Sequence, residues 1–143
     1  MNYVGKLKDE EGNTFYPETL ESNEVIYSGW ESGLTLTLDK TIKGCDEVEV
    51  IFQRGNDYGS ASTGRMIVQS KDSDNANAYG TAELIYINGT YQARITIKVE
   101  IVGNTLTKRS HRINFDGNAV TGPANYDSET YYVARVIGYK RVR

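Results

Sequence analysis

Four aromatic side chains stand in polar, glycine-rich stretches of the chain, where they could meet a ligand. Tyr58, Tyr79 and Tyr126 each lie in one of three predicted long loops, and Trp30 lies in the predicted turn Ser28–Gly33. An exposed aromatic ring stacks on the apolar face of a sugar while its hydroxyl or N–H group bonds a polar neighbour. These four residues are therefore the candidate binding residues for a glycan or a protein surface. The alternative for each ring is that it folds back over one end of the core.

Groups that could catalyse a reaction occur without the partners that such chemistry needs. Glu47 and Glu49 lie two residues apart on a predicted strand, so they share a face, and paired carboxylates can hydrolyse a glycosidic bond. Acidic residues on any solvated strand have the same spacing. His111, the single histidine, has no Ser, Cys or second His placed to form a nucleophilic dyad. The sequence therefore predicts a protein that is not an enzyme.

No metal site or other cofactor is expected. The segment Asp72–Asn77, with Glu83 after it, partly matches a calcium-binding loop. Ala76 stands where an oxygen ligand belongs and Asn77 stands where the sharp turn needs glycine, so we interpret the segment as a polar loop. Cys45 is the single cysteine, which excludes an intramolecular disulfide and a cysteine-based zinc site.

One basic cluster is present, formed by Lys108, Arg109, His111 and Arg112. On a strand, alternate members of this cluster point to opposite faces, so they do not make a single cationic surface. We interpret the cluster as charge on an edge strand, where it discourages aggregation between sheets.

The composition fits one small domain without a nucleic-acid or membrane partner. The chain has 143 residues, and its net charge of −3 is too mild to attract nucleic acid or an anionic membrane. Apolar runs stay short, as at Leu84–Ile87, so no membrane insertion is expected. No cleavable signal is visible at the N-terminus. We expect synthesis in a reducing cytoplasm, followed by assembly, release or lysis.

Hydrophobicity with a period of two is the main structural signal, and it predicts an all-β fold. From Ala93 to Ile101 apolar residues stand at every odd position and polar residues at every even one, as in a strand with one buried face. The dipeptide Asn88-Gly89 predicts a tight hairpin, and Gly103-Asn104 predicts the next. Similar patterns predict eight strands, at about 24–28, 34–38, 47–53, 65–70, 82–88, 91–102, 105–115 and 131–140.

Eight strands with 14 glycines and two prolines predict an antiparallel β-sandwich of jelly-roll type. A closed barrel of the lipocalin type is the competing architecture, but it needs more regular hairpins. The long loops predicted at 54–64, 71–81 and 116–130 would carry the contacts. Residues 1–22 are polar and lack periodicity. We expect them to form an N-terminal arm or junction, with residues 23–143 as the head domain.

Several segments together carry a family resemblance. They are Glu24-Val25-Ile26-Tyr27-Ser28-Gly29-Trp30, Leu34-Thr35-Leu36-Thr37-Leu38 and Asp46-Glu47-Val48-Glu49-Val50. In this order they resemble tail-tip, tail-fibre and baseplate proteins of bacteriophages and prophages of Gram-positive bacteria. The closing Ala134–Lys140 is similar to the ending of many of those proteins, and Lys8–Pro17 is similar to the junction ahead of their head domain. The resemblance covers both ends of the chain, while residues 54–130 share only the rhythm of strands.

The resemblance implies a virion component, typically a homotrimer, made in the cytoplasm of the bacterial host. Such a protein binds a host-surface polysaccharide or teichoic acid as receptor, or packs against other tail proteins. The resemblance brings no catalytic residue and no ligand motif. The predicted strand 131–140 has apolar residues on both faces, as expected for a strand buried between layers or subunits.

Two alternatives to the virion protein remain. One is a non-catalytic carbohydrate-binding module of a bacterial protein. The other, ranked last, is a small hydrolase that uses Glu47 and Glu49 as its acid pair.

Overall fold

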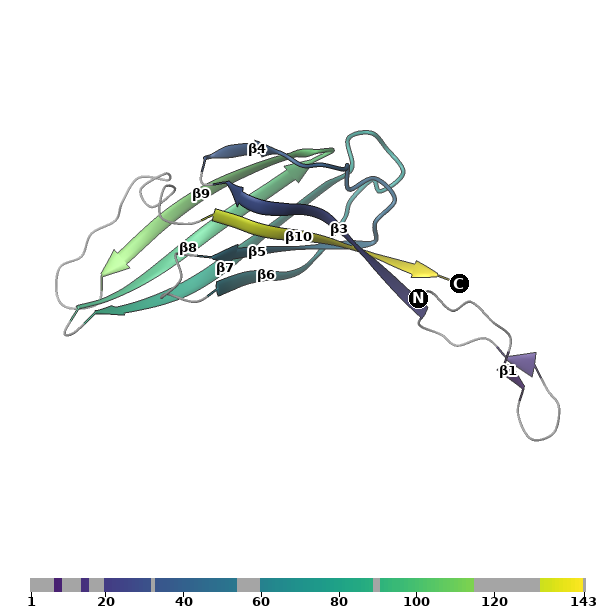
Figure 1. The fold of residues 1–143 in the computed structure, drawn as a ribbon, viewed down its shortest axis with the longest axis horizontal. Helices are drawn as coiled ribbons and strands as arrows, with labels where there is room; N and C mark the ends of the chain where they lie inside the picture. Colours follow the sequence, from purple (N-terminus) through teal and green to yellow (C-terminus); the bar gives the residue numbers. More distant parts are fainter. Residues whose placement is uncertain are drawn as a thin grey trace.

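The protein is all-β in the part that the structure describes. The computed structural model describes residues 7–8, 14–15, 20–31, 33–53, 60–88, 91–114 and 132–142. These residues form strands and turns, and no helix among them is long and apolar enough to cross a membrane. Eight of the strands form two antiparallel sheets of four strands each (Figure 1).

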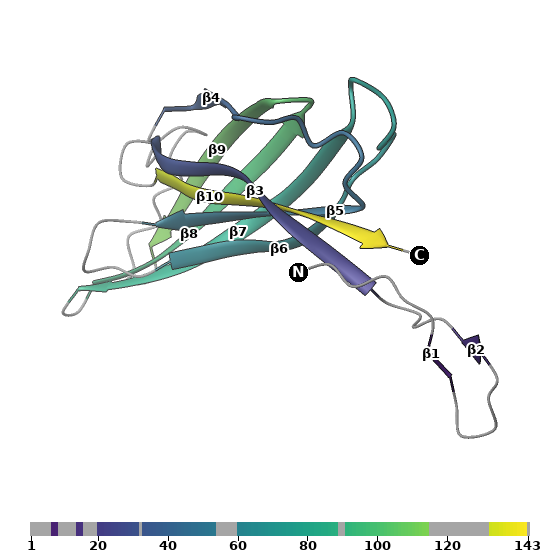
Figure 2. The same cartoon turned by 45° about the vertical axis from the view of Figure 1, so that its right-hand side comes forward.

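The two sheets draw their strands from different parts of the chain. The first, which we call the β10 sheet, has the order β3-β10-β5-β6 and contains β3 (Leu20–Glu31), β5 (Glu47–Gln53), β6 (Ser60–Ile67) and β10 (Tyr132–Val142). The second, the β8 sheet, has the order β4-β9-β8-β7 and contains β4 (Thr35–Thr37), β7 (Asn77–Asn88), β8 (Tyr91–Val102) and β9 (Thr105–Asn114). A short pair, β1 (Leu7–Lys8) and β2 (Thr14–Phe15), lies away from both sheets (Figures 1 and 2).

The eight predicted strands are present, although several of their ends differ. The strands predicted at 47–53 and 91–102 have the same bounds in the structure. In contrast, β6 begins at Ser60 and β7 begins at Asn77. The C-terminal ends of the predicted loops 54–64 and 71–81 therefore belong to strands. β7 begins earlier than predicted because its partner β8 is long enough to pair with it as far as Asn77.

The β8 sheet is built from two consecutive hairpins. The first joins β7 to β8 close to the predicted position, but its last pair is Asn88 with Tyr91, so Asn88 belongs to the strand and not to the turn as predicted. The second joins β8 to β9, where Gly103 has a positive φ of 60°. The predicted alternation along β8 is confirmed, since its apolar residues from Ile95 to Ile101 are buried while Lys98 and Glu100 are exposed.

The β10 sheet depends on the strand that comes last in the chain. β10 lies between β3 and β5 and pairs antiparallel with both. It therefore joins three segments that are far apart in sequence. The apolar residues predicted to face inward on β5, which are Val48, Val50 and Phe52, are completely buried, and so are Val133 and Val136 of β10. This burial accounts for one of the two apolar faces of β10.

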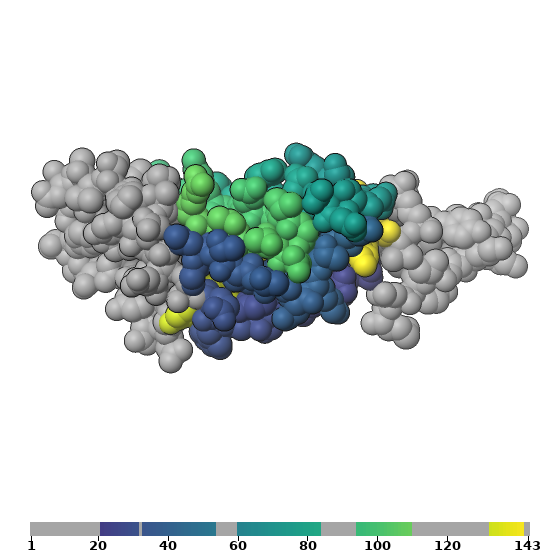
Figure 3. Space-filling view, turned by 90° about the horizontal axis from the view of Figure 1, so that it is seen from above, coloured from purple at the N-terminus to yellow at the C-terminus, as the bar shows by residue number. Residues whose placement is uncertain are grey.

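The two sheets cover each other and share one hydrophobic core. Buried side chains from both sheets form a single cluster, in which Phe52 and Ile95 are among the largest. The strands of the two sheets cross at an angle (Figure 2). On one side of the molecule the residues around β4 fill the space between β9 and β3 (Figure 3). There Leu38 and Ile42 donate backbone hydrogen bonds to Asn104 and Gly103.

The sheets do not close into a barrel, which rules out the lipocalin-type alternative. β3 and β6 are the outer strands of the β10 sheet, while β4 and β7 are those of the β8 sheet. At the side formed by β6 and β7, the bridge between Gln69 and Asn77 links the sheets at one end.

Gly138 lets β10 lie close to the core residues beneath it. A Cβ atom at this position would lie 2.6 Å from Cys45 Sγ and 2.7 Å from Ile26 Cδ1. Cys45 and Ile26 are themselves fully buried, so neither can move aside without disturbing its own neighbours. A side chain at 138 is therefore incompatible with the packing of the central strand.

We predict that Gly138→Ala destabilises the protein by about 1–3 kcal/mol, because overpacking a filled core forces its neighbours out of place. The matched control is Gly33→Ala, since a Cβ at Gly33 would lie 3.6 Å from its nearest neighbour, the Thr35 carbonyl oxygen. The control should change stability by less than about 0.5 kcal/mol. Urea unfolding followed by tryptophan fluorescence measures both, and equal stability of the two variants would contradict the close contact.

Candidate functional site

The structure describes two of the four candidate aromatic residues, Trp30 and Tyr79, and places both on strands. Trp30 belongs to β3, which continues to Glu31, so the predicted turn at 28–33 is wrong over most of its length. Tyr79 belongs to β7 rather than to a loop. Their side chains are 61% and 56% exposed, so neither ring folds into the core. Tyr58 and Tyr126 lie outside the described residues.

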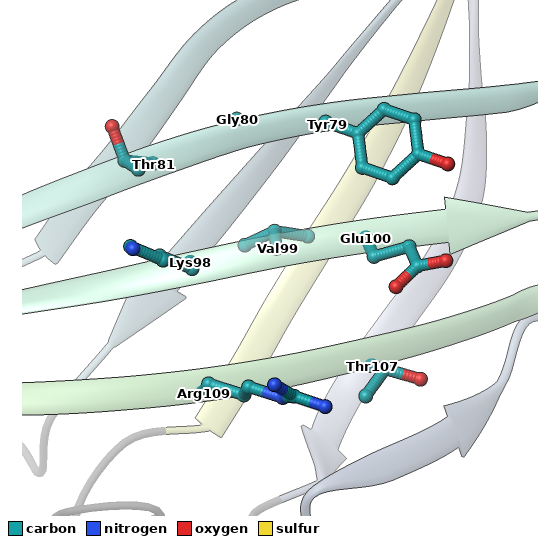
Figure 4. Close-up of a pocket in the computed structure, with 8 residues that line it drawn as sticks. All are labelled: Tyr79, Gly80, Thr81, Lys98, Val99, Glu100, Thr107 and Arg109. Carbon is teal, nitrogen blue, oxygen red and sulfur yellow. The ribbon is translucent and has the colours of Figure 1, made fainter. Parts of the chain in front are cut away.

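Trp30 and Tyr79 do not form one site, because they lie on the outer faces of different sheets. Trp30 packs edge-on against Tyr132 of β10, with ring centroids 5.2 Å apart and an angle of 77° between the planes. Tyr79 instead stands on the outer face of the β8 sheet, next to polar side chains from two further strands (Figure 4).

Tyr79 borders a hollow of about 450 Å³ on the outer face of the β8 sheet (Figure 4). The strand register arranges its outward side chains in two rows. Thr81, Lys98 and Arg109 are paired across β7, β8 and β9 and form the first row. Tyr79, Glu100 and Thr107 form the second row in the same way. The backbone of Gly80 and Val99 lies between the rows.

The charged groups of the hollow have no ion-pair partner among the described residues. Lys98 of β8 stands directly opposite Arg109 of β9, and both are exposed. Figure 4 shows that their side chains extend in opposite directions along the sheet, with the Glu100 carboxylate between the Tyr79 ring and the Arg109 strand. The hollow therefore offers an aromatic ring, hydroxyl groups, an acceptor and two cations to a ligand.

A second hollow, also of about 450 Å³, lies on the other side of Tyr79 between β6 and β7. It shares Tyr79, Gly80 and Thr81 with the first. Ile67, which is 74% exposed, also lines it. A ligand longer than one hollow can therefore continue past the Tyr79 ring towards β6.

The acid pair of the hydrolase alternative is held in hydrogen bonds on the outer face of the β10 sheet. Glu49 accepts one hydrogen bond from the Tyr139 hydroxyl, at 2.7 Å, and another from the Ser62 hydroxyl. Both bonds lower the pKa of the Glu49 carboxyl, and the bond from Ser62 has the larger effect. Glu47 accepts a hydrogen bond from Arg141 at 3.3 Å. A carboxyl with a lowered pKa is a poor general acid at neutral pH, so Glu49 could serve only as the ionised member of an acid pair.

The candidate calcium loop is divided between two unrelated ion pairs. Asp74 lies 2.9 Å from Lys43 Nζ, and Glu83 lies 3.1 Å from Arg94 Nε. Over the described ranges no three His, Cys, Asp or Glu residues gather in a way that could hold a metal ion. The two ends of the motif thus have different partners, as expected for a polar loop followed by a strand.

The basic cluster follows the part of β9 that pairs with β4, which is Thr105–Thr107, so beyond Lys108 no described strand covers this side of β9. Lys108 lies just past that pairing, and its backbone N–H donates to the Leu34 carbonyl. Its side chain is buried, with 2% exposed. Burial lowers the pKa of Lys108 from 10.5 to about 8. The side chains of His111 and Arg112 lie outside the described residues.

We predict that Lys108 makes stability depend on pH above neutrality. Its folded pKa of about 8 lies below the unfolded value, so the unfolded chain binds more protons between these pH values and stability rises with pH there. In Lys108→Met this rise should be absent. The free energy of unfolding of wild type relative to the variant should therefore increase by about 2–3 kcal/mol from pH 7 to pH 10.5. Urea titrations at several pH values measure it, and a constant difference would contradict a buried, titrating Lys108.

Comparison with known proteins gives no match. No family model matches this chain, and no curated protein or solved structure matches it.

Proposed function

We propose that the chain forms the head of a phage tail or fibre protein, and that the hollow around Tyr79 binds a glycan of the host surface. Two observations support this proposal. The segments at both ends of the chain resemble tail-tip and baseplate proteins of phages of Gram-positive bacteria. The single observation that carries the choice of site is the exposed Tyr79 ring beside a hollow lined by polar side chains.

The chemistry of the second row fits a sugar ring. The Tyr79 ring provides a face on which the apolar C–H groups of a pyranose can stack. Beside it, the Glu100 carboxylate accepts hydrogen bonds from sugar hydroxyls, and the Thr107 hydroxyl can donate or accept one. All three side chains stand on paired strands, so the backbone that carries them is already ordered before a ligand binds.

The strand order also supports a sandwich related to the jelly roll. In the β8 sheet, three hairpin-connected strands have β4 placed beside the last of them. This is the order of a Greek key read in reverse. In the β10 sheet, β10 returns to lie beside β3. Such long returning connections are the features that jelly rolls share with other sandwiches.

The outer face of the β10 sheet is the proposed contact between subunits of a trimer. Val25 and Trp30 of β3 are 51% and 61% exposed there, next to Ile137 and Tyr132 of β10. Exposed apolar residues that gather on one face are typical of surfaces that bind another protein. This face is the second apolar side of β10, which the core does not bury.

A carbohydrate-binding module of a bacterial protein would use the same hollow, so virion membership separates the two functions. Mass spectrometry of purified phage particles from the source strain should detect the chain among the tail proteins. Its absence from particles, together with its presence in a secreted bacterial protein, would favour the module.

We predict that Tyr79→Ala lowers glycan binding about tenfold, because the burial and stacking of a ring contribute on the order of 1–2 kcal/mol. The matched control is Leu34→Ala, which removes an exposed apolar side chain that lines neither hollow. Binding of the purified variants to a glycan array and to host cell walls measures the effect. Equal loss in both variants, or loss only with Leu34→Ala, would contradict the proposed site.

We predict that the wild-type chain sediments as a trimer and that Val25→Asp combined with Trp30→Ser gives monomers. A buried unpaired carboxylate and a lost aromatic contact both oppose association. The control is Ile67→Ser, which removes the most exposed of the described large apolar side chains from a different edge. Analytical ultracentrifugation distinguishes the species, and a wild-type monomer of 16.0 kDa at high concentration would contradict this interface.

A further inference from the structure

The first row of the hollow places two like charges side by side. Lys98 and Arg109 are directly opposite residues of adjacent antiparallel strands. Like charges in this position destabilise a sheet. Any polar residue would fit at these two exposed positions. The folded sheet therefore does not require this unfavourable pair of charges.

Nearly all other exposed cations of the described residues are neutralised by a carboxylate. The ion pairs are Lys40–Glu24, Lys43–Asp74, Arg65–Glu21, Lys71–Asp46, Arg94–Glu83, Lys140–Glu24 and Arg141–Glu47. Lys98, Arg109 and Arg135 are the exposed cations without one in the described part of the chain. Two of these three, Lys98 and Arg109, therefore line the same hollow.

The nearby carboxylate does not cancel the pair. Glu100 stands in the second row, two residues from Lys98 along β8, and it forms no ion pair with any described residue. Two cations and one carboxylate leave the hollow with a net positive charge. Both cationic residues stand in the first row and the carboxylate in the second, and the Arg109 side chain extends along β9 towards Thr107 (Figure 4).

We propose that Lys98 and Arg109 bind an anionic substituent of the glycan, either a phosphodiester or a carboxylate. This inference rests on the proposed function and adds the ligand class. In the structure the two side chains extend away from each other (Figure 4), and an anion above the first row would draw both towards it and form charge-assisted hydrogen bonds, in which a guanidinium can be bidentate. The Thr81 hydroxyl in the same row is an additional donor.

The spacing of the rows leaves room for a sugar and an anionic group. Side chains two residues apart on a strand face are separated by about 7 Å, so a sugar over one row and an anionic group over the other can be held at the same time. The second row would hold the ring on Tyr79 with its hydroxyls at Glu100, while the first row would hold the anion. The hollow therefore fixes the direction of the ligand across the strands.

The test uses the full chain and an array that holds each oligosaccharide in three forms. One form is neutral, one carries a uronate carboxylate and one carries a phosphodiester. We expect wild type to bind an anionic form at least tenfold more tightly than its neutral form, and the advantage should shrink at high salt. The carboxylate and phosphodiester arms identify which anion is preferred.

The decisive variant is Lys98→Gln combined with Arg109→Gln. It should lose the tenfold preference and bind the neutral and anionic forms with equal affinity. It should also melt at the same or a higher temperature than wild type, because the like-charge pair is gone. The control Arg135→Gln removes an unpaired cation from the β10 sheet and should keep the preference.

The outcomes separate this inference from the proposed function. Glycan binding that needs Tyr79 but is equal for neutral and anionic forms, or a preference that survives in the double variant, would overturn the inference alone. Binding of no glycan form by wild type would overturn both. A double variant that unfolds would show that the pair has a structural role, which also overturns the inference.

Discussion

The pairing of β10 with both β3 and β5 is the interaction on which the rest of the structure depends. β3 is hydrogen-bonded to no other strand of its sheet, so without β10 that sheet loses its order. The inner face of the β10 sheet covers the buried apolar residues of β8, which would otherwise be exposed to water. Since these contacts join the two ends of the chain, the core forms only when the C-terminal strand has inserted. Gly138 is the point where this insertion is tightest.

The packing of the core determines which side chains lie on the outer face of the β8 sheet. Because alternate residues of β8 must be buried, Lys98 and Glu100 must point outward. Continuous pairing with β7 and β9 then sets their neighbours across the sheet. The hollow beside Tyr79 is thus made from residues that folding leaves unconstrained, on strands that folding makes rigid. In the other sheet, the outward carboxylate Glu49 is tied to Ser62 and Tyr139, which makes that face a structural one.

Much of this arrangement could be predicted from the sequence, and the missing part has a clear physical origin. Period-two hydrophobicity predicts the eight strands, and two turn dipeptides predict the positions of both hairpins of the β8 sheet. The Gly103-Asn104 turn also gives the register that brings Arg109 opposite Lys98. The register of β7 does not follow from Asn88-Gly89, because Asn88 itself pairs with Tyr91, so the position of Tyr79 opposite Glu100 depends on pairing along the whole strand. The burial of Lys108 and the insertion of β10 are different, because they depend on contacts between distant segments that local patterns do not encode.

The central claim is that recognition takes place on the outer face of β7, β8 and β9. It is tested most directly by amide NMR spectra of the chain with and without host cell-wall polysaccharide. The account predicts that the largest shift changes fall at residues 79–81, 98–100 and 107–109, which line the hollow. Changes confined to β3 and β10, with the β8 sheet unaffected, would contradict it.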